Sequence, residues 1–164
     1  MQAIFHHVIA LAVALAIALI VAALPAQAAE DPRDFVAAIY QSYVGKDAKG
    51  IPINSPRARQ LITPSLMKLI DADAGAAAKR GEPPRLDGDP FIDAQDFDIK
   101  SFNVEVQEVG RARAVATDTF KNEASAGNDP IVLVLVKIGD AWRVDDFRGG
   151  SGSVRNYLSR KPGR

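Results

Sequence analysis

The 164-residue chain contains no cysteine and only two histidines, His6 and His7. Without cysteine it can form no disulfide, so an exported domain of this kind must rest on its packed core. Both histidines lie in a segment that we expect to be removed. The remaining chain then lacks the residues of Ser-His-Asp and Cys-His catalysis, of histidine general bases and of the usual zinc sites.

An excess of charge of one sign is also missing, because 20 basic residues balance 20 acidic ones. A nucleic-acid partner is therefore not expected, since it would favour a basic surplus. No glycine-rich phosphate loop is present: "RGGSGS" (148–153) has glycines but no Lys-Ser/Thr, and we interpret it as a flexible link. The sequence predicts no cofactor.

Seventeen apolar residues without a charge run from Val8 to Leu24, and Ala26-Gln27-Ala28 follows them. This layout predicts a secretory signal peptide over residues 1–28, cleaved between Ala28 and Ala29, and a periplasmic or secreted protein. The segment before the run has no Lys or Arg, so an uncleaved anchor remains the alternative. Contact with a membrane is expected only in that case.

Residues 29–164 are expected to form a single domain with a core over about 35–158. Asp31-Pro32, Ser55-Pro56 and Thr63-Pro64 combine a capping side chain with a proline at the first helical position. Apolar residues with helical spacing then predict one helix that ends near Gly45 and a second helical region that continues to about Lys79.

Beyond residue 100 the apolar period changes from four to two, which is typical of strands. We expect strands over 101–107, 111–121, 131–138 and 141–147, with a tight hairpin at Gly139-Asp140 and a short helix from Ser153. The nearly continuous apolar run 131–138 predicts a central strand with both faces covered. Helices followed by an antiparallel meander indicate the α+β class.

The stretch "DGDPFIDAQDFD" (87–98) carries five aspartates in twelve residues. As a calcium loop it would use Asp87 and Asp89, but Phe91 and Ile92 replace the next ligand and the glycine of an EF-hand. As an active site its carboxylates could share acid–base work. We favour a structural interpretation, in which Asp89 caps a turn before Pro90 and Asp93 or Asp96 caps a short helical turn.

A second pair of acids, Asp145 and Asp146, ends the last strand in "AWRVDDF" (141–147). Strict alternation would place Asp146 on the face of Trp142 and Val144, and Phe147 opposite. A carboxylate beside a buried tryptophan is costly unless it is hydrogen-bonded, so we expect Asp146 to fasten the acidic loop or the terminal helix, or to line a pocket. The candidate binding or structural cluster comprises Asp87, Asp89, Asp93, Gln95, Asp96 and Asp146.

Three segments together carry a family resemblance: "DPFIDAQDF" (89–97), "WRVDDF" (142–147) and "GSVRNYL" (152–158). Their order resembles the bacterial domain of unknown function 3828 family, which comprises small exported or envelope proteins, over about residues 35–158. The D-P-F-x-x-A-Q-D part is the most specific. Some relatives carry a lipid on an N-terminal cysteine, which is absent here.

This resemblance implies a fold like nuclear transport factor 2 and the cystatin-like cones: N-terminal helices packed on a curved antiparallel sheet, with a short C-terminal helix. Such cones often hold a pocket, and they host isomerases, dehydratases and non-catalytic binding proteins. The family has no established activity or catalytic residue to transfer.

We therefore expect a non-enzymatic exported binding module that takes a small ligand or an envelope protein, with a pocket near Tyr40, Tyr43 and Trp142. One alternative is a histidine-free isomerase or dehydratase with an aspartate base and Tyr40 or Tyr43 as the hydrogen-bond donor. Another is a calcium-stabilised structural domain.

Overall fold

A computed structural model describes residues 31–125 and 129–160 of the chain. The elements are α2 (Pro32–Tyr40), a 3-10 turn η1 (Gln41–Tyr43), α3 (Pro56–Leu61), α4 (Pro64–Arg80), β1 (Ile99–Gly110), β2 (Arg113–Asn122), β3 (Ile131–Ile138), β4 (Ala141–Gly149), β5 (Gly152–Ser153) and α5 (Val154–Ser159). The five strands form one antiparallel sheet in chain order, so the α+β class is confirmed. The expected signal segment and its cleavage site at Ala28 and Ala29 lie outside the described residues.

The three predicted capping signals each begin a helix. The side chains of Asp31, Ser55 and Thr63 accept hydrogen bonds from backbone N–H groups of the first turn, and a proline follows each of them. α4 ends at Gly81, whose φ of 68° is the left-handed conformation that glycine adopts without steric cost. Within the described part of the chain, no helix is long and apolar enough to span a membrane.

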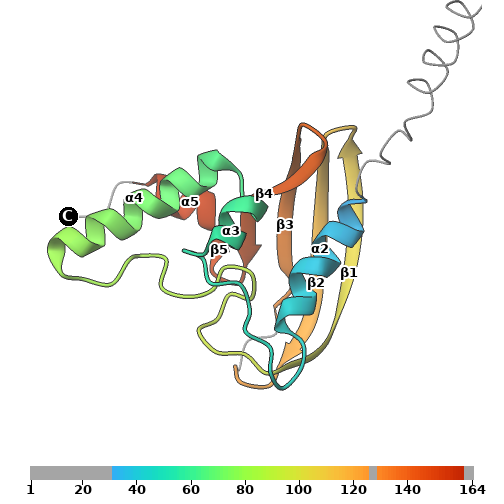
Figure 1. The fold of residues 1–164 in the computed structure, drawn as a ribbon, viewed down its shortest axis with the longest axis horizontal. Helices are drawn as coiled ribbons and strands as arrows, with labels where there is room; N and C mark the ends of the chain where they lie inside the picture. The colour runs from blue at the N-terminus through green and yellow to red at the C-terminus, as the bar shows by residue number, and fades with distance from the viewer. Residues whose placement is uncertain (1–30, 126–128, 161–164) are drawn as a thin grey trace, which may run out of the picture.

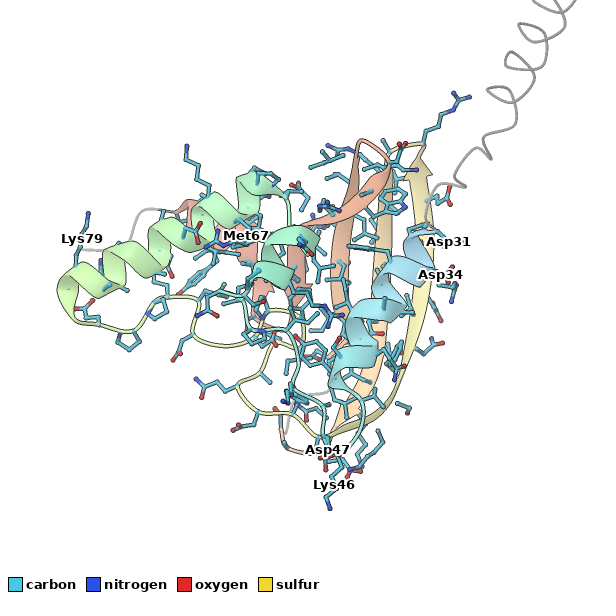
Figure 2. All side chains as sticks on the ribbon, viewed as in Figure 1. Asp31, Asp34, Lys46, Asp47, Met67 and Lys79 are labelled. Carbon is cyan, nitrogen blue, oxygen red and sulfur yellow. The ribbon has the colours of Figure 1, made fainter. Side chains whose placement is uncertain are left out.

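The main core lies between α2, α3 and one face of the sheet (Figure 1). The prediction that β3 is covered on both faces is wrong. Ile131, Leu133 and Leu135 are buried, but the alternate valines of the strand are only partly buried. α4 does not cover the second face of β3. It extends beyond the sheet, so that Lys79 near its C-terminal end lies far from Asp31 at the start of α2 (Figure 2).

β4 contains a β-bulge that the sequence did not reveal. Val144 pairs with Leu135 while Asp146 pairs with Val134, which leaves Asp145 as the extra residue. The bulge reverses the alternation, so Asp146 lies on the face opposite Val144, and Phe147 returns to the core with an exposure of 1%. Our placement of Asp146 beside Trp142 and Val144 is therefore wrong, because one inserted residue shifts every later side chain to the other face.

The segment after β4 is a turn and not the flexible link that we expected. Arg148 pairs with Ser153 and Gly149 with Gly152, which adds β5 to the edge of the sheet. The chain then enters α5, which packs against α4 and β4 (Figure 1). This turn faces the acidic stretch, and the two segments together frame the candidate site.

Candidate functional site

Asp89 closes the acidic stretch into a compact loop. Its backbone N–H donates to the carbonyl oxygen of Ala94 at 2.9 Å, and its side-chain Oδ1 accepts from the N–H of Phe91 at 2.9 Å. Asp89 therefore caps a turn, as the sequence predicted. Asp93 does not cap a helical turn: it takes a φ of 49°, and its carboxylate reaches across to the β4–β5 turn.

Two buried tyrosines hold this loop from the core side. The Tyr40 hydroxyl donates to the carbonyl oxygen of Phe91 at 2.9 Å, and the Tyr43 hydroxyl donates to Oδ2 of Asp89 at 2.5 Å. Tyr40, Tyr43 and Trp142 are 1%, 0% and 4% exposed, so the expected pocket around them is replaced by packed core. Because both hydroxyls already donate within the protein, neither is available as the substrate donor of an isomerase-like site.

Burial governs the ionisation of these groups. Burial, followed by the charge of Asp89, raises the pKa of Tyr43 far above its usual value. Burial also raises the pKa of Asp89 to about 6, although hydrogen bonds from Tyr43 and Phe91 favour its charged form. Tyr43 thus stays a proton donor at any physiological pH, while Asp89 changes its charge in mildly acidic solution.

Arg85 ties the start of the acidic stretch to two helices. Its Nε lies 2.7 Å from Oδ1 of Asp73 in α4, and its guanidinium also donates to the carbonyl oxygens of Tyr157, Leu158 and Arg160 around the end of α5. Burial works against ionisation of Asp73, but hydrogen bonds from Arg85 and the Leu86 N–H hold its pKa below the usual value.

The pair of Arg85 and Asp73 was not among the predicted site residues, although the sequence carries a signal for it. Asp73 stands on the apolar stripe of α4, three residues after Ile70 and four before Ala77. A lone acid at such a position is buried with the stripe and therefore needs a partner.

The two acids of β4 anchor the last helix. Asp146 accepts at Oδ1 from the Arg155 N–H at 2.9 Å, and at Oδ2 from Ser153 Oγ at 2.8 Å and Arg148 Nε at 3.0 Å. Asp145 accepts from Thr63 Oγ1 and from the Arg155 guanidinium. Of the roles considered for Asp146, the structure supports fastening of the terminal helix.

A cleft of about 470 Å³ lies between the acidic stretch and the C-terminal segment. One wall comes from residues within 85–95 and the other from residues within 147–157. Of the predicted cluster, Asp87, Asp89, Asp93 and Gln95 line this cleft. Asp96 lines a separate depression, and Asp146 lies under the start of α5.

Two carboxylates in the lining of the cleft, those of Asp93 and Asp87, have only uncharged hydrogen-bond partners among the described residues. Oδ2 of Asp93 accepts from the Ser151 N–H at 3.1 Å and lies so close to Gly149 that a Cβ there would be 2.6 Å from this oxygen. Oδ2 of Asp87 accepts from Gln95 Nε2 at 3.3 Å. Both aspartates are exposed, so water and ligands can reach them.

The arrangement does not build the calcium loop considered above. Among residues 31–125 and 129–160, no group of three or more acidic or histidine side chains is placed to hold a metal ion. Both oxygens of Asp89 already accept hydrogen bonds, from Phe91 and Tyr43. Asp87 and Asp89 therefore lack the further carboxylates that calcium requires in this structure.

A second buried acid, Asp118 in β2, was also missed. It is 0% exposed on the core face of the sheet, and neither carboxyl oxygen has a hydrogen-bond partner. Burial raises its pKa to about 7. Extending the alternation of Ala114 and Ala116 by two residues would have placed Asp118 in the core.

Comparisons with models of protein families, with curated proteins and with solved structures found no match. The resemblance to the domain of unknown function 3828 family accordingly stays a prediction. The function has to be argued from the cleft and its charges.

Proposed function

We propose that the protein is an exported, non-enzymatic binding module whose cleft takes a small organic cation with an apolar part. The observation that carries this proposal is the cleft itself. Its volume of about 470 Å³ falls within the range of roughly 300–1,000 Å³ that is typical of small-molecule sites. Its two walls are held in place by Asp89, Arg85 and Asp146, so the site exists before a ligand arrives.

Charge favours a cation as the ligand. Asp87 and Asp93 line the cleft without an ionic partner among the described residues. The cation in the wall, Arg85, is already engaged by Asp73 and by carbonyl oxygens of the C-terminal segment. The negative potential of the two free carboxylates is concentrated by the low-dielectric walls of a cleft.

The apolar lining favours an organic cation over a bare metal ion. Leu86 and Val154 are partly exposed and offer aliphatic surface in the lining of the cleft. The Tyr157 ring is 45% exposed and adds aromatic surface, and the Arg85 guanidinium already lies over this ring, 5.3 Å from its centroid. An amine with a hydrocarbon or aromatic part would satisfy the carboxylates and this surface together.

Titration calorimetry with phenethylamine, and with phenylacetate as its anionic counterpart, tests the proposal. We expect the amine to bind and the acid not to bind. Asp87→Asn with Asp93→Asn should weaken amine binding about tenfold or more, since one lost charge contact of about 1.4 kcal/mol has that effect. The asparagine oxygen at 93 can still accept from the Ser151 N–H, so the turn is kept.

Asp96→Asn is the matched control, because it removes an exposed aspartate of the same stretch outside the cleft. It should leave amine binding unchanged. Absence of amine binding at millimolar concentration, or equal weakening by the control, would reject the cleft as a cation site.

We also propose that helices and sheet form a cone like that of nuclear transport factor 2, and that the chain belongs to the domain of unknown function 3828 family. The D-P-F-x-x-A-Q-D segment and the antiparallel sheet with α2 and α3 on one face support this. Export is supported by the apolar run 8–24 and the small residues after it. Intact mass of the protein from a secreting bacterial host should correspond to a chain that begins at Ala29, and retention of residues 1–28 would contradict cleavage.

A further inference from the structure

Asp118 is buried in a way that acids seldom are. Within the described part of the chain the buried acids are Asp73, Asp118 and Asp146, and the other two each accept several hydrogen bonds. Both oxygens of Asp118 lie without a partner. A carboxylate in such a place is strongly disfavoured unless it takes up a proton.

The elements around Asp118 offer no positive charge to it. Across the sheet it pairs with Val104 in β1 and Ile131 in β3, which are both apolar and buried. From α2 the titratable neighbour is Tyr40, whose hydroxyl donates to the Phe91 carbonyl. The Arg33 guanidinium of α2 is engaged at the carbonyl oxygen of Val104.

The titratable groups on the other side of Tyr40, Asp89 and Tyr43, also carry no positive charge. Asp89 and Tyr43 act on Tyr40 from the side of the acidic stretch, and they are bonded to each other. Burial is the cause that raises the pKa of Asp118 to about 7. The carboxyl is therefore neutral in mildly acidic solution and ionises near neutral pH inside an apolar environment.

Tyr40 connects this acid to the cleft wall. Its ring packs against Phe102 in β1 and against Phe120 in β2, the strand of Asp118, and its hydroxyl donates to the carbonyl oxygen of Phe91 at 2.9 Å. Phe91 follows Asp89 and Pro90, which both line the cleft. Tyr40 is therefore a direct contact between the part of α2 that packs on the sheet and the acidic stretch.

We propose that Asp118 is a proton-operated switch: protonated, it keeps α2 and the acidic stretch packed on the sheet, and on losing its proton it loosens both. The direction follows from linkage. The acid is harder to ionise in the folded than in the unfolded protein, so stability falls as pH rises from the unfolded value of 3.8 to about 7 and then levels off. The switch does not depend on which ligand the cleft takes.

Thermal melts and near-ultraviolet circular dichroism of the purified protein between pH 6 and 8 test this inference. Asp89, with a pKa of about 6, titrates at the lower edge of that window, whereas the pKa of Asp118, about 7, lies at its centre, so Asp118 contributes the larger share of the change. We expect the melting temperature to fall by about 5 °C from pH 6 to 8, with loss of aromatic dichroism as the tyrosines loosen. Asp118→Asn should remove most of both changes and leave only the smaller share of Asp89, and Asp96→Asn should retain them in full.

If Asp118→Asn does not fold, Asp118→Val supplies an apolar strand residue of similar width that also cannot titrate. A carbon-13 carboxyl titration of the unaltered protein gives a measurement without any variant. A melting temperature that stays constant from pH 6 to 8, a non-titrating variant that keeps the same fall, or a carboxyl at Asp118 that titrates near 4 would each overturn the switch.

Discussion

At the scale of single residues, the ion pairs differ in how far their side chains are exposed to water. Arg85 and Asp73 form the most enclosed ion pair among the described residues, with side-chain exposures of 23% and 3%. Arg80 and Glu82, only a few residues away, form a pair at a similar distance but with exposures of 43% and 58%. The two pairs compare the same ionic contact in a buried and an exposed setting, and Arg85 in addition donates to three carbonyl oxygens of the C-terminal segment.

Replacing Arg85 by methionine should destabilise the fold by roughly 3–5 kcal/mol, because it leaves the Asp73 carboxylate buried without its partner. Arg80→Met should cost less than about 1 kcal/mol, since its pair is exposed and screened. Urea unfolding measures both free energies. Adding Asp73→Leu to Arg85→Met should recover much of the loss, and equal effects of the two arginine substitutions would mean that water reaches the Asp73 carboxylate in the folded protein.

At the scale of the elements, local signals predicted what local physics decides. The structure confirms the three helix starts predicted from a capping residue followed by proline, and the strands predicted from a period of two. A helix terminus and a pleated strand face each depend on a few neighbouring residues. The bulge at Asp145 was not predictable from β4 alone. It lies in the pairing with β3, and Asp145 there bonds to Thr63 at the N-cap of α4 and to Arg155 in α5, of which β3 and Thr63 lie outside the local sequence of β4.

The same division applies to the candidate site. The acidic stretch was identified from the sequence, and Asp89 was correctly assigned to a turn. The sequence could not show that residues 147–157 form the opposite wall, since that depends on how α5 folds back. Tyr40 and Tyr43 were expected near a pocket because of their residue type, but packing against Phe91, Phe102 and Phe120 places them in the core.

At the scale of the whole molecule, the buried acids oppose one another in their response to pH. Asp118 and Asp89 have raised folded pKa values, so they make the fold less stable as pH rises above the unfolded value of 3.8. Asp73 has a lowered one, so its contribution is present above that value and is lost as pH falls below it. The free energy of unfolding therefore rises with pH where Asp73 ionises and falls with pH where Asp89 and Asp118 resist ionisation, which places its maximum at acidic pH.

We therefore expect the free energy of unfolding to be greatest near pH 4 and to decline toward pH 8, with Asp118 alone contributing roughly 4 kcal/mol to that decline from the difference between 3.8 and about 7. Urea unfolding at intervals from pH 3 to 9 gives the curve. Asp73→Asn should flatten the loss below pH 4 and leave the decline above pH 5 in place, because it removes only the acid with the lowered pKa. A maximum at pH 7 or above would mean that water reaches Asp118 and Asp89 in the folded protein, since a solvated carboxylate would bring both pKa values back to their ordinary range.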